Sequence, residues 1–220
     1  MTRGNIAVRK FVCLTLMLAC LAPTIGCGLF ANFLNVMGAG LVPPAFAGLK
    51  NKKVAVVCVS NSQLFGPTST SAELSTRVNR LLGTKAKDVE LIPNQRVEDW
   101  IDQNGWDMVD FFAIGRGVEA DMVIAIDVES FSLHDGATMF KGRSDVHMVV
   151  YDMHSEQEVF AQSPPQIEFP TTAGVSATST SEREFRRLFL DTVARRLARN
   201  FYAFDINEDV AGDVVTMSRI

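Results

Sequence analysis

Two apolar segments constrain the fold most, because each is hydrophobic on both faces of a predicted strand. Residues 53–60 form a continuous run of mainly β-branched residues, and residues 120–133 begin in the same way before they alternate. A strand that is apolar on both faces has to be covered on both sides, which places it in the interior of a sheet. We therefore expect a sheet with helices packed against it.

Helical patterns occupy four other stretches of the chain. Helices are expected over residues 72–82, 94–104, from Asp107 to Gly115 or Gly117, and 181–201. Gly83 is expected to end the first of these and Asn94 to cap the second. Ser181 and Glu184 form a capping box at the start of the last helix.

Shorter strand patterns complete the domain. Strands are expected over residues 89–92, 145–153 and 158–162, with an exposed hairpin tip at 136–142 and a long loop at 163–180. Residues 205–220 are expected to be disordered. The order predicts an α/β (α+β) fold, a single domain over residues 50–204 with a mixed, mostly antiparallel sheet and helices packed on it.

The first 26 residues predict a secretory signal. Arg3, Arg9 and Lys10 precede an uncharged apolar run at residues 11–22, and small residues follow as far as Gly26. A basic segment, an apolar core and a small-residue cleavage region are the three parts of a signal peptide. The segment therefore predicts export.

Cys27 follows that region in a context that resembles the lipobox of bacterial lipoproteins. The resemblance implies cleavage before Cys27 and acylation of its thiol, with palmitate among the acyl chains, which would anchor the protein stably in a membrane. Thr24 departs from the commonest lipobox residue, and Cys20 is a competing site. Residues 27–49 are then a membrane-proximal apolar linker, and one membrane span within residues 11–49 is the alternative.

Composition excludes several classes of protein. The 220 residues are 47% hydrophobic and 21% charged, with a net charge of −4, which is typical of a globular domain and argues against a nucleic-acid partner. Without residues 1–26, 18 basic and 25 acidic residues remain, a net charge of −7. Cys58 would then be the one cysteine left for the domain, so no internal disulfide is expected.

The passage that leads into the long strand carries a resemblance to a group of envelope proteins. A glycine at position 117 is followed by Ala120, Asp121 and an apolar strand. This resembles the periplasmic domain shared by the curli-secretion lipoprotein, the penicillin-binding-protein activator lipoprotein and the amino-terminal domain of the Tol translocation protein, over residues 53–204. The resemblance implies a protein that binds other envelope proteins or assembles into rings, and that is not an enzyme through this domain. Residues 104–107 and 141–145 also resemble uncharacterised bacterial lipoproteins, for which no function is implied.

The sequence contains no common catalytic signature. It has no Gly-x-Ser-x-Gly elbow, Walker loop or His-Glu-x-x-His motif. Three histidines and three acids could converge at one end of the strand meander: His134, His147, His154, Asp127, Glu129 and Asp135. Their spacing matches no known ligand pattern, so we predict no metal and no cofactor. A metal-dependent or small-ligand-binding secreted hydrolase that uses this cluster is the alternative function.

Six arginines give the last predicted helix a basic side: Arg183, Arg186, Arg187, Arg195, Arg196 and Arg199. A solvated amphipathic helix is the simpler explanation of this pattern. Contact with an acidic partner, anionic lipid headgroups or a glycan polymer is the alternative. Lys141 and Arg143, at the predicted hairpin tip, form a second exposed basic site. We predict that Arg187, Arg195, Arg196, Lys141 and Arg143 bind the partner.

Together these features predict a non-enzymatic, lipid-anchored cell-envelope protein. It would be held in the cell membrane or outer membrane, face the periplasm, and bind an envelope protein partner or form a homo-oligomer.

Overall fold

The structure is a computed structural model that describes residues 41–60, 69–105 and 110–205. It divides into two compact units, residues 1–41 and 42–220, and the second contains the predicted α/β domain. Cys20, Cys27 and the predicted signal lie outside the described residues. Among the described helices, none has the length and apolar character needed to cross a membrane.

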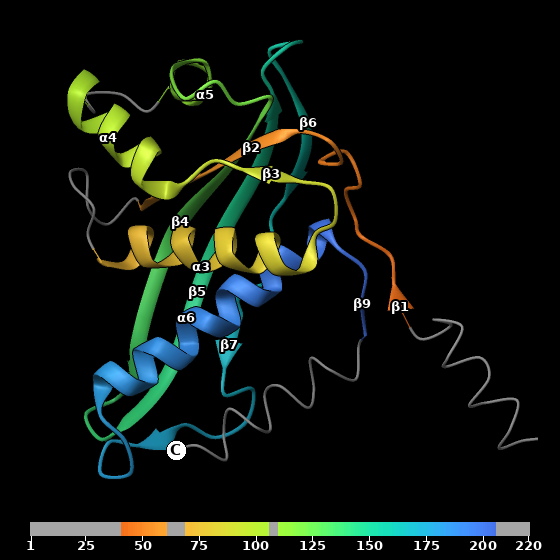
Figure 1. The fold of residues 1–220 in the computed structure, drawn as a ribbon. Coiled ribbons are helices and arrows are strands. Elements are labelled where there is room, and N and C mark those ends of the chain that lie inside the picture. The colour runs from red at the N-terminus through yellow and green to blue at the C-terminus, as the bar shows by residue number, and fades with distance from the viewer. Residues whose placement is uncertain (1–40, 61–68, 106–109, 206–220) are drawn as a thin grey trace, which may run out of the picture. The chain divides into compact units, whose positions relative to one another are not determined.

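A seven-stranded mixed sheet forms the centre of the second unit (Figure 1). Its main path is β3 (Glu90–Leu91), β2 (Lys53–Ser60), β4 (Met122–Asp135), β5 (Met139–Asp152) and β6 (Gln157–Gln162), while β7 (Ile167–Phe169) and β8 (Val175–Ser176) pair with the first part of β5. β2 runs parallel to β3 and β4, and the other pairs are antiparallel. The short strand β1 (Leu41–Val42) lies at the boundary between the two units.

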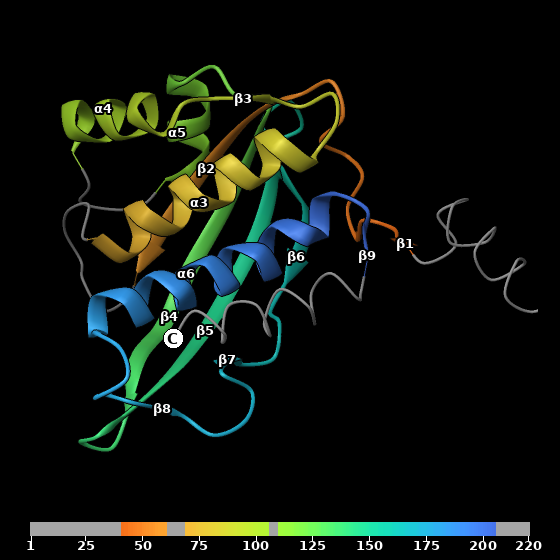
Figure 2. The ribbon, with the colours of Figure 1, turned by 60° about the horizontal axis from the view of Figure 1, so that its bottom comes forward.

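Helices pack on both faces of this sheet. The bounds are α3 (Ser69–Lys85), α4 (Asn94–Asn104), α5 (Phe111–Gly117) and α6 (Glu182–Ala198), followed by the 3-10 helix η2 (Arg199–Phe201) and β9 (Phe204–Asp205). α3 and α6 lie side by side across one face (Figure 2). α4 and α5 share a smaller apolar cluster with the opposite face of β2 and β4. The predicted α/β fold class is confirmed.

The alternation of β4 explains both clusters. Met122, Ile124 and Ile126 belong to the larger core with α3 and α6, whereas Val123 belongs to the cluster with α4 and α5. The register of β4 with β5 shifts between Val128 and Ser130. A β-bulge at this point reverses the alternation, so that Phe131 packs against the larger core.

Two predicted helix boundaries were wrong. α3 continues past Gly83 to Lys85. Gly83 packs closely against β3, because a Cβ at this position would lie 3.2 Å from the Leu91 side chain. Asn94 is the first residue of α4 and does not cap it, because its side chain is used between helices. Asn94 Nδ2 donates to Ser75 Oγ at 2.8 Å, and Asn79 Nδ2 donates to Asn94 Oδ1.

The start of α5 and of β5 also differ from the prediction. Asp110 caps α5, with its carboxylate accepting from the Phe112 and Ala113 amides at 2.9 and 3.0 Å, whereas Asp107 lies outside the described residues. β5 begins at Met139, so the exposed tip predicted for residues 136–142 is mostly strand. The predicted loop at 163–180 includes β7 and β8.

Candidate functional site

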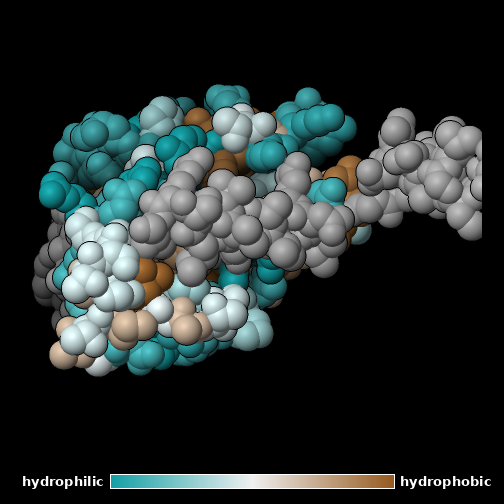
Figure 3. All heavy atoms as spheres, turned by 90° about the horizontal axis from the view of Figure 1, so that it is seen from below, coloured by the Kyte–Doolittle hydropathy of each residue, from teal (hydrophilic) through white to brown (hydrophobic). Residues whose placement is uncertain are grey.

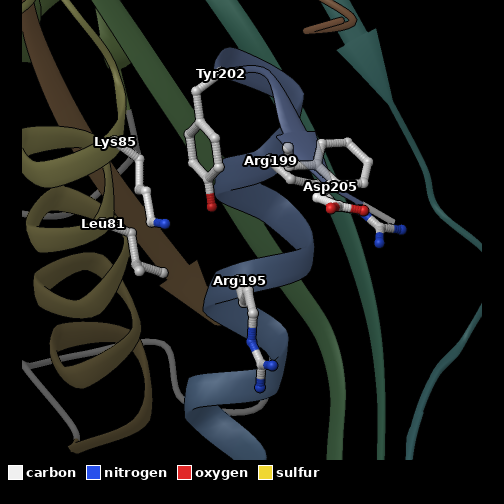
Figure 4. Close-up of a pocket in the computed structure, with 7 residues that line it drawn as sticks. Leu81, Lys85, Arg195, Arg199, Tyr202 and Asp205 are labelled. Atoms are coloured by element: carbon white, nitrogen blue, oxygen red, sulfur yellow. The ribbon is translucent and has the colours of Figure 1, made fainter. Parts of the chain in front are cut away.

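A pocket opens where the C-terminal ends of α3 and α6 lie together. Its lining residues come from three segments that are distant in sequence: Leu81, Lys85, Arg195, Arg199, Tyr202, Phe204 and Asp205. Leu81 and Lys85 extend from α3 towards α6, and the Tyr202 ring lies between the two helices (Figure 4). We refer to these seven residues as the basic pocket.

The walls of the basic pocket combine apolar surface with positive charge. The Arg199 guanidinium lies over the Phe204 ring, 5.3 Å from its centroid, a cation–π contact that holds the group beside an apolar surface. Tyr202 is largely buried, while Lys85 is exposed and Arg195 is half-buried. The pocket therefore suits a ligand that carries an acidic group next to an apolar one.

The seam between α3 and α6 changes character along its length. Near the middle of the seam, Arg77 Nη1 lies 2.6 Å from Asp191 Oδ1 and Arg80 lies 3.5 Å from the same atom. Towards the start of both helices, Arg186 lies 3.4 Å from Glu73. In these places acids and arginines alternate across the seam.

The C-terminal end of the seam brings cationic and apolar side chains together. Lys85, Arg195 and Arg199 line the basic pocket with Asp205, Leu81 and Phe204. Cationic side chains attract anionic groups.

The predicted arginine surface of α6 is not a single face. Arg186 turns towards α3 and also lies over the Phe131 ring, 5.6 Å from its centroid. Arg187 is exposed and lies 2.5 Å from Glu184 of the same helix. Arg195 lines the basic pocket, and Arg196, which is half-buried, does not.

Lys141 and Arg143 project from the opposite face of the sheet. Between them, the backbone of Gly142 faces α6, because a Cβ there would lie 2.4 Å from the Phe189 ring. Successive side chains of a strand point to opposite faces, so Lys141 and Arg143 point away from α6. They pair there with Glu168, at 3.1 and 3.7 Å. The structure thus separates the two groups of predicted partner-binding residues.

The three histidines do not converge. His134 pairs in register with Phe140 on β5, and His147, seven residues further along β5, pairs with Asp127. His154 lies seven residues beyond His147. At about 3.3 Å per residue along β5, His147 is roughly 20 Å from the position that pairs with His134, and His154 lies in the turn after β5. Within the described part of the chain, no group of three His, Cys, Asp or Glu side chains could hold a metal ion.

Polar side chains on the face of the sheet away from α6 pair with one another across strands. The Asp145 carboxylate accepts from Ser130 Oγ at 2.6 Å and from Gln166, and these hydrogen bonds lower the pKa of Asp145. Burial, together with the nearby Glu129, raises the pKa of Asp127. The His147 ring nitrogen Nδ1 lies 2.7 Å from Ser163 Oγ.

Cys58 is suited to packing. It packs against the larger core from β2, and burial raises the pKa of its thiol. A thiol that resists ionisation is a poor nucleophile. Cys58 therefore contributes to packing within β2.

No protein-family model matches the chain, and no curated protein matches it in sequence. Among solved structures, it is similar to lipoprotein GNA1162 from Neisseria meningitidis, with a TM-score of 0.44 and 15% identity over 66% of this chain and 97% of that one. It is also similar to the PelC dodecamer from Paraburkholderia phytofirmans (TM-score 0.40, 15% identity, 73% and 93% covered). The C-terminal domain of LpoB from Salmonella enterica gives a TM-score of 0.38 and 13% identity, with 55% and 85% covered.

LpoB and GNA1162 are lipoproteins, the class of protein that the sequence resembles. The TM-scores are below 0.5, and these likenesses carry no information about the site.

Local sequence patterns indicate one side of the basic pocket and not the other. The helical spacing of the arginines singled out Arg195 and Arg199. Lys85 was an ordinary residue near a predicted helix end, and Tyr202 to Asp205 lay at the border of the predicted tail. Their convergence depends on α3 packing against α6, which no local pattern reveals.

Proposed function

We propose that this protein is a lipid-anchored component of a bacterial cell envelope whose α/β domain binds an acidic segment of a protein partner in the basic pocket. The anchor would be Cys27, exposed by removal of the signal at residues 1–26, and the domain would face the periplasm. The proposed role is binding and not catalysis.

The observation that carries the binding half of this proposal is the lining of the basic pocket, which combines the cationic side chains of Lys85, Arg195 and Arg199 with apolar ones. Electrostatic attraction would steer an acidic segment to the pocket, and Leu81 and Phe204 would bury its apolar neighbour.

Of the predicted partner-binding residues, we place Arg195 at the centre of this surface. Arg187 and Arg196 would lie at its edge on α6. Lys141 and Arg143, on the other face of the sheet, would serve a second contact, such as one with another copy of this chain.

A photo-cross-linking residue in place of Leu81, in full-length protein in its native host, tests the proposal. The expected result is a covalent adduct of discrete mass that is lost when Arg195→Glu is added. The matched control carries the cross-linker at Lys141 and should not give the same adduct. An adduct that is insensitive to Arg195→Glu, or that forms equally from position 141, would reject the basic pocket as the partner site.

A further inference from the structure

Two large hydrophobic side chains are exposed on the described part of the second unit. They are Val42, at 37%, and Val159, at 40%. Each belongs to a stretch without a charged residue, residues 42–49 and 159–167. Residues 42–48 and 159–166 are all exposed or half-buried, so both stretches belong to the surface.

The two stretches meet through aromatic rings. The Phe46 ring lies 5.4 Å from Phe160 and 6.3 Å from Phe201 between centroids, and the Phe46 backbone N–H donates to the Asn200 carbonyl at 2.9 Å. These contacts hold the segment that leads into β2 beside β6, the last strand of the main sheet path (Figure 1). We refer to residues 42–47 and 159–161 as the apolar edge.

A bulge in β6 accounts for the exposure of Val159. Phe160 pairs with Val150 and Glu158 pairs with Tyr151, so Val159 is an extra residue without a partner on β5. Bulges at a sheet edge redirect a side chain and obstruct the pairing of a further strand. The edge therefore presents an apolar side chain and is poorly suited to adding a strand.

Prolines make strand addition still less favourable. Pro43 and Pro44 lie in the first stretch, and Pro164 and Pro165 follow β6. Proline has no N–H to donate to a ladder, so an extended segment of a second copy or of a partner finds few hydrogen bonds here. A lipid surface needs no hydrogen-bond register, and the apolar edge has no charge to desolvate against it.

The chain enters the domain at this same surface. Val42 is the first residue of the second unit and follows the proposed acylation site, Cys27, by 15 residues. At no more than about 3.6 Å per residue, the apolar edge begins within roughly 54 Å of the anchor. Such a tether gives an effective concentration in the millimolar range, so contact through a few apolar side chains is sufficient.

We infer that the apolar edge lies against the surface of the bilayer that holds the acyl chains of Cys27. This contact rests on the proposed anchor and adds an orientation to it. Met139 and Val150 are 11 residues apart on β5, roughly 36 Å at about 3.3 Å per residue. The hairpin tip at residues 136–138 would then lie well away from the lipid.

Quenching by nitroxide lipids tests the contact in full-length protein purified from the membrane fraction of its native host and reconstituted in phosphatidylcholine liposomes. An NBD fluorophore is attached to Ala161→Cys in the apolar edge or, as the matched control, to Thr138→Cys at the hairpin tip, both at exposed positions. Lipids with a nitroxide in the headgroup region should quench the label at 161 and not at 138. Raised salt should leave the quenching unchanged, because the contact is apolar.

Unmodified wild-type protein is the blank for labelling. Burial raises the pKa of the Cys58 thiol, which makes it a poor nucleophile towards the label, and an acylated Cys27 has no free thiol. We therefore expect the wild type to remain unlabelled.

Charge variants set the specificity of the quenching. Val42→Asp with Val159→Asp places two charges on the apolar edge at exposed positions. The pair should lower the ratio of lipid-bound to free domains about tenfold, equivalent to about 1.4 kcal/mol. Ala137→Asp with Ala177→Asp adds the same charge at exposed positions outside the apolar edge and should leave the quenching at 161 unchanged.

Several results would overturn the inference: no quenching at 161, equal quenching at 138, or quenching that persists in the Val42→Asp, Val159→Asp variant. Emission from 161 at short wavelength without quenching by lipid would mean that a partner or a second copy covers the apolar edge, which also overturns it. All these outcomes leave the anchor in place. Label on the wild type would instead show a free cysteine among residues 1–27 and would reject the anchor, and the inference with it.

Discussion

The two faces of the sheet are covered by helices to different extents. On one face α3 and α6 bury a continuous core whose largest fully buried side chains include Phe169, Phe185 and Phe189. On the other face α4 and α5 cover a smaller cluster around Ala55, Val57 and Val123. Further along, that second face carries two hydrogen bonds: Ser130 donates to Asp145, and Arg143 donates to Asp135.

This difference indicates that a strand is apolar where helices cover it, whichever strand it pairs with. β4 and β5 are both 14 residues long and pair along their lengths, yet their side chains are mostly apolar only where helices cover them. The described surface seen from below is mostly hydrophilic, with apolar side chains in small patches (Figure 3). Stability is therefore expected to reside mainly in the face covered by α3 and α6.

The largest effect should come from the centre of that face. Phe185 is fully buried, and its ring lies 5.3 Å from Phe140 and 5.9 Å from Phe169 between centroids. Phe185→Ala leaves a cavity and should lower the free energy of unfolding by about 3–5 kcal/mol, measured by urea denaturation. Val159→Ala, at a side chain 40% exposed, is the control and should cost less than about 0.5 kcal/mol. Similar costs at the two positions would contradict the comparison.

The cluster under α4 and α5 should contribute less. Ile114 is buried in it, and Ile114→Ala should lower the free energy of unfolding by about 2–3 kcal/mol, because the smaller cluster leaves fewer neighbours to lose. The same urea experiment measures it. A cost equal to that of Phe185→Ala would mean that the two faces stabilise the fold equally.

Two carboxylates on the second face should give opposite pH effects. The folded pKa of Asp127 is raised, so its charged form destabilises the fold above that pKa, and the penalty fades as the pH falls through it. Asp127→Asn should therefore be more stable than the wild type at pH 7, by less than the core substitutions cost, and the gain should shrink towards pH 4.

Asp145 is the counterpart, because its folded pKa is lowered. Its stabilisation is present above the unfolded value of 3.8 and is lost as the pH falls towards the folded pKa. Asp145→Asn should be less stable than the wild type at pH 7. Urea denaturation between pH 3 and pH 7 checks both variants, and shifts of the same sign would contradict the assignment.

The smallest effect should come from an ion pair on the same face. Arg143 lies 3.1 Å from Asp135 and 3.7 Å from Glu168, and its side chain is partly exposed. Arg143→Ala should change the free energy of unfolding by less than about 1 kcal/mol. A larger loss in urea denaturation would show that the polar face is part of the stabilising structure.

The sequence predicted the strands better than the site. Residues 53–60 and the alternation of residues 122–128 were recognised because strand periodicity is local. The bulge after Val128, and the use of Asn94 between helices, depend on tertiary packing and could not be read from local patterns. The basic pocket was half predicted for the same reason, since Arg195 belongs to a helical pattern and Lys85 does not.

We propose that this domain is held at a membrane through Cys27, and the intact mass of the protein from the membrane fraction of its native host tests this proposal most directly. We predict a mass that matches residues 27–220 plus acyl chains, and a Cys27→Ser variant that lacks the acyl mass and leaves the membrane fraction. A soluble, unacylated wild-type protein, or one that retains residues 1–26, would contradict the account.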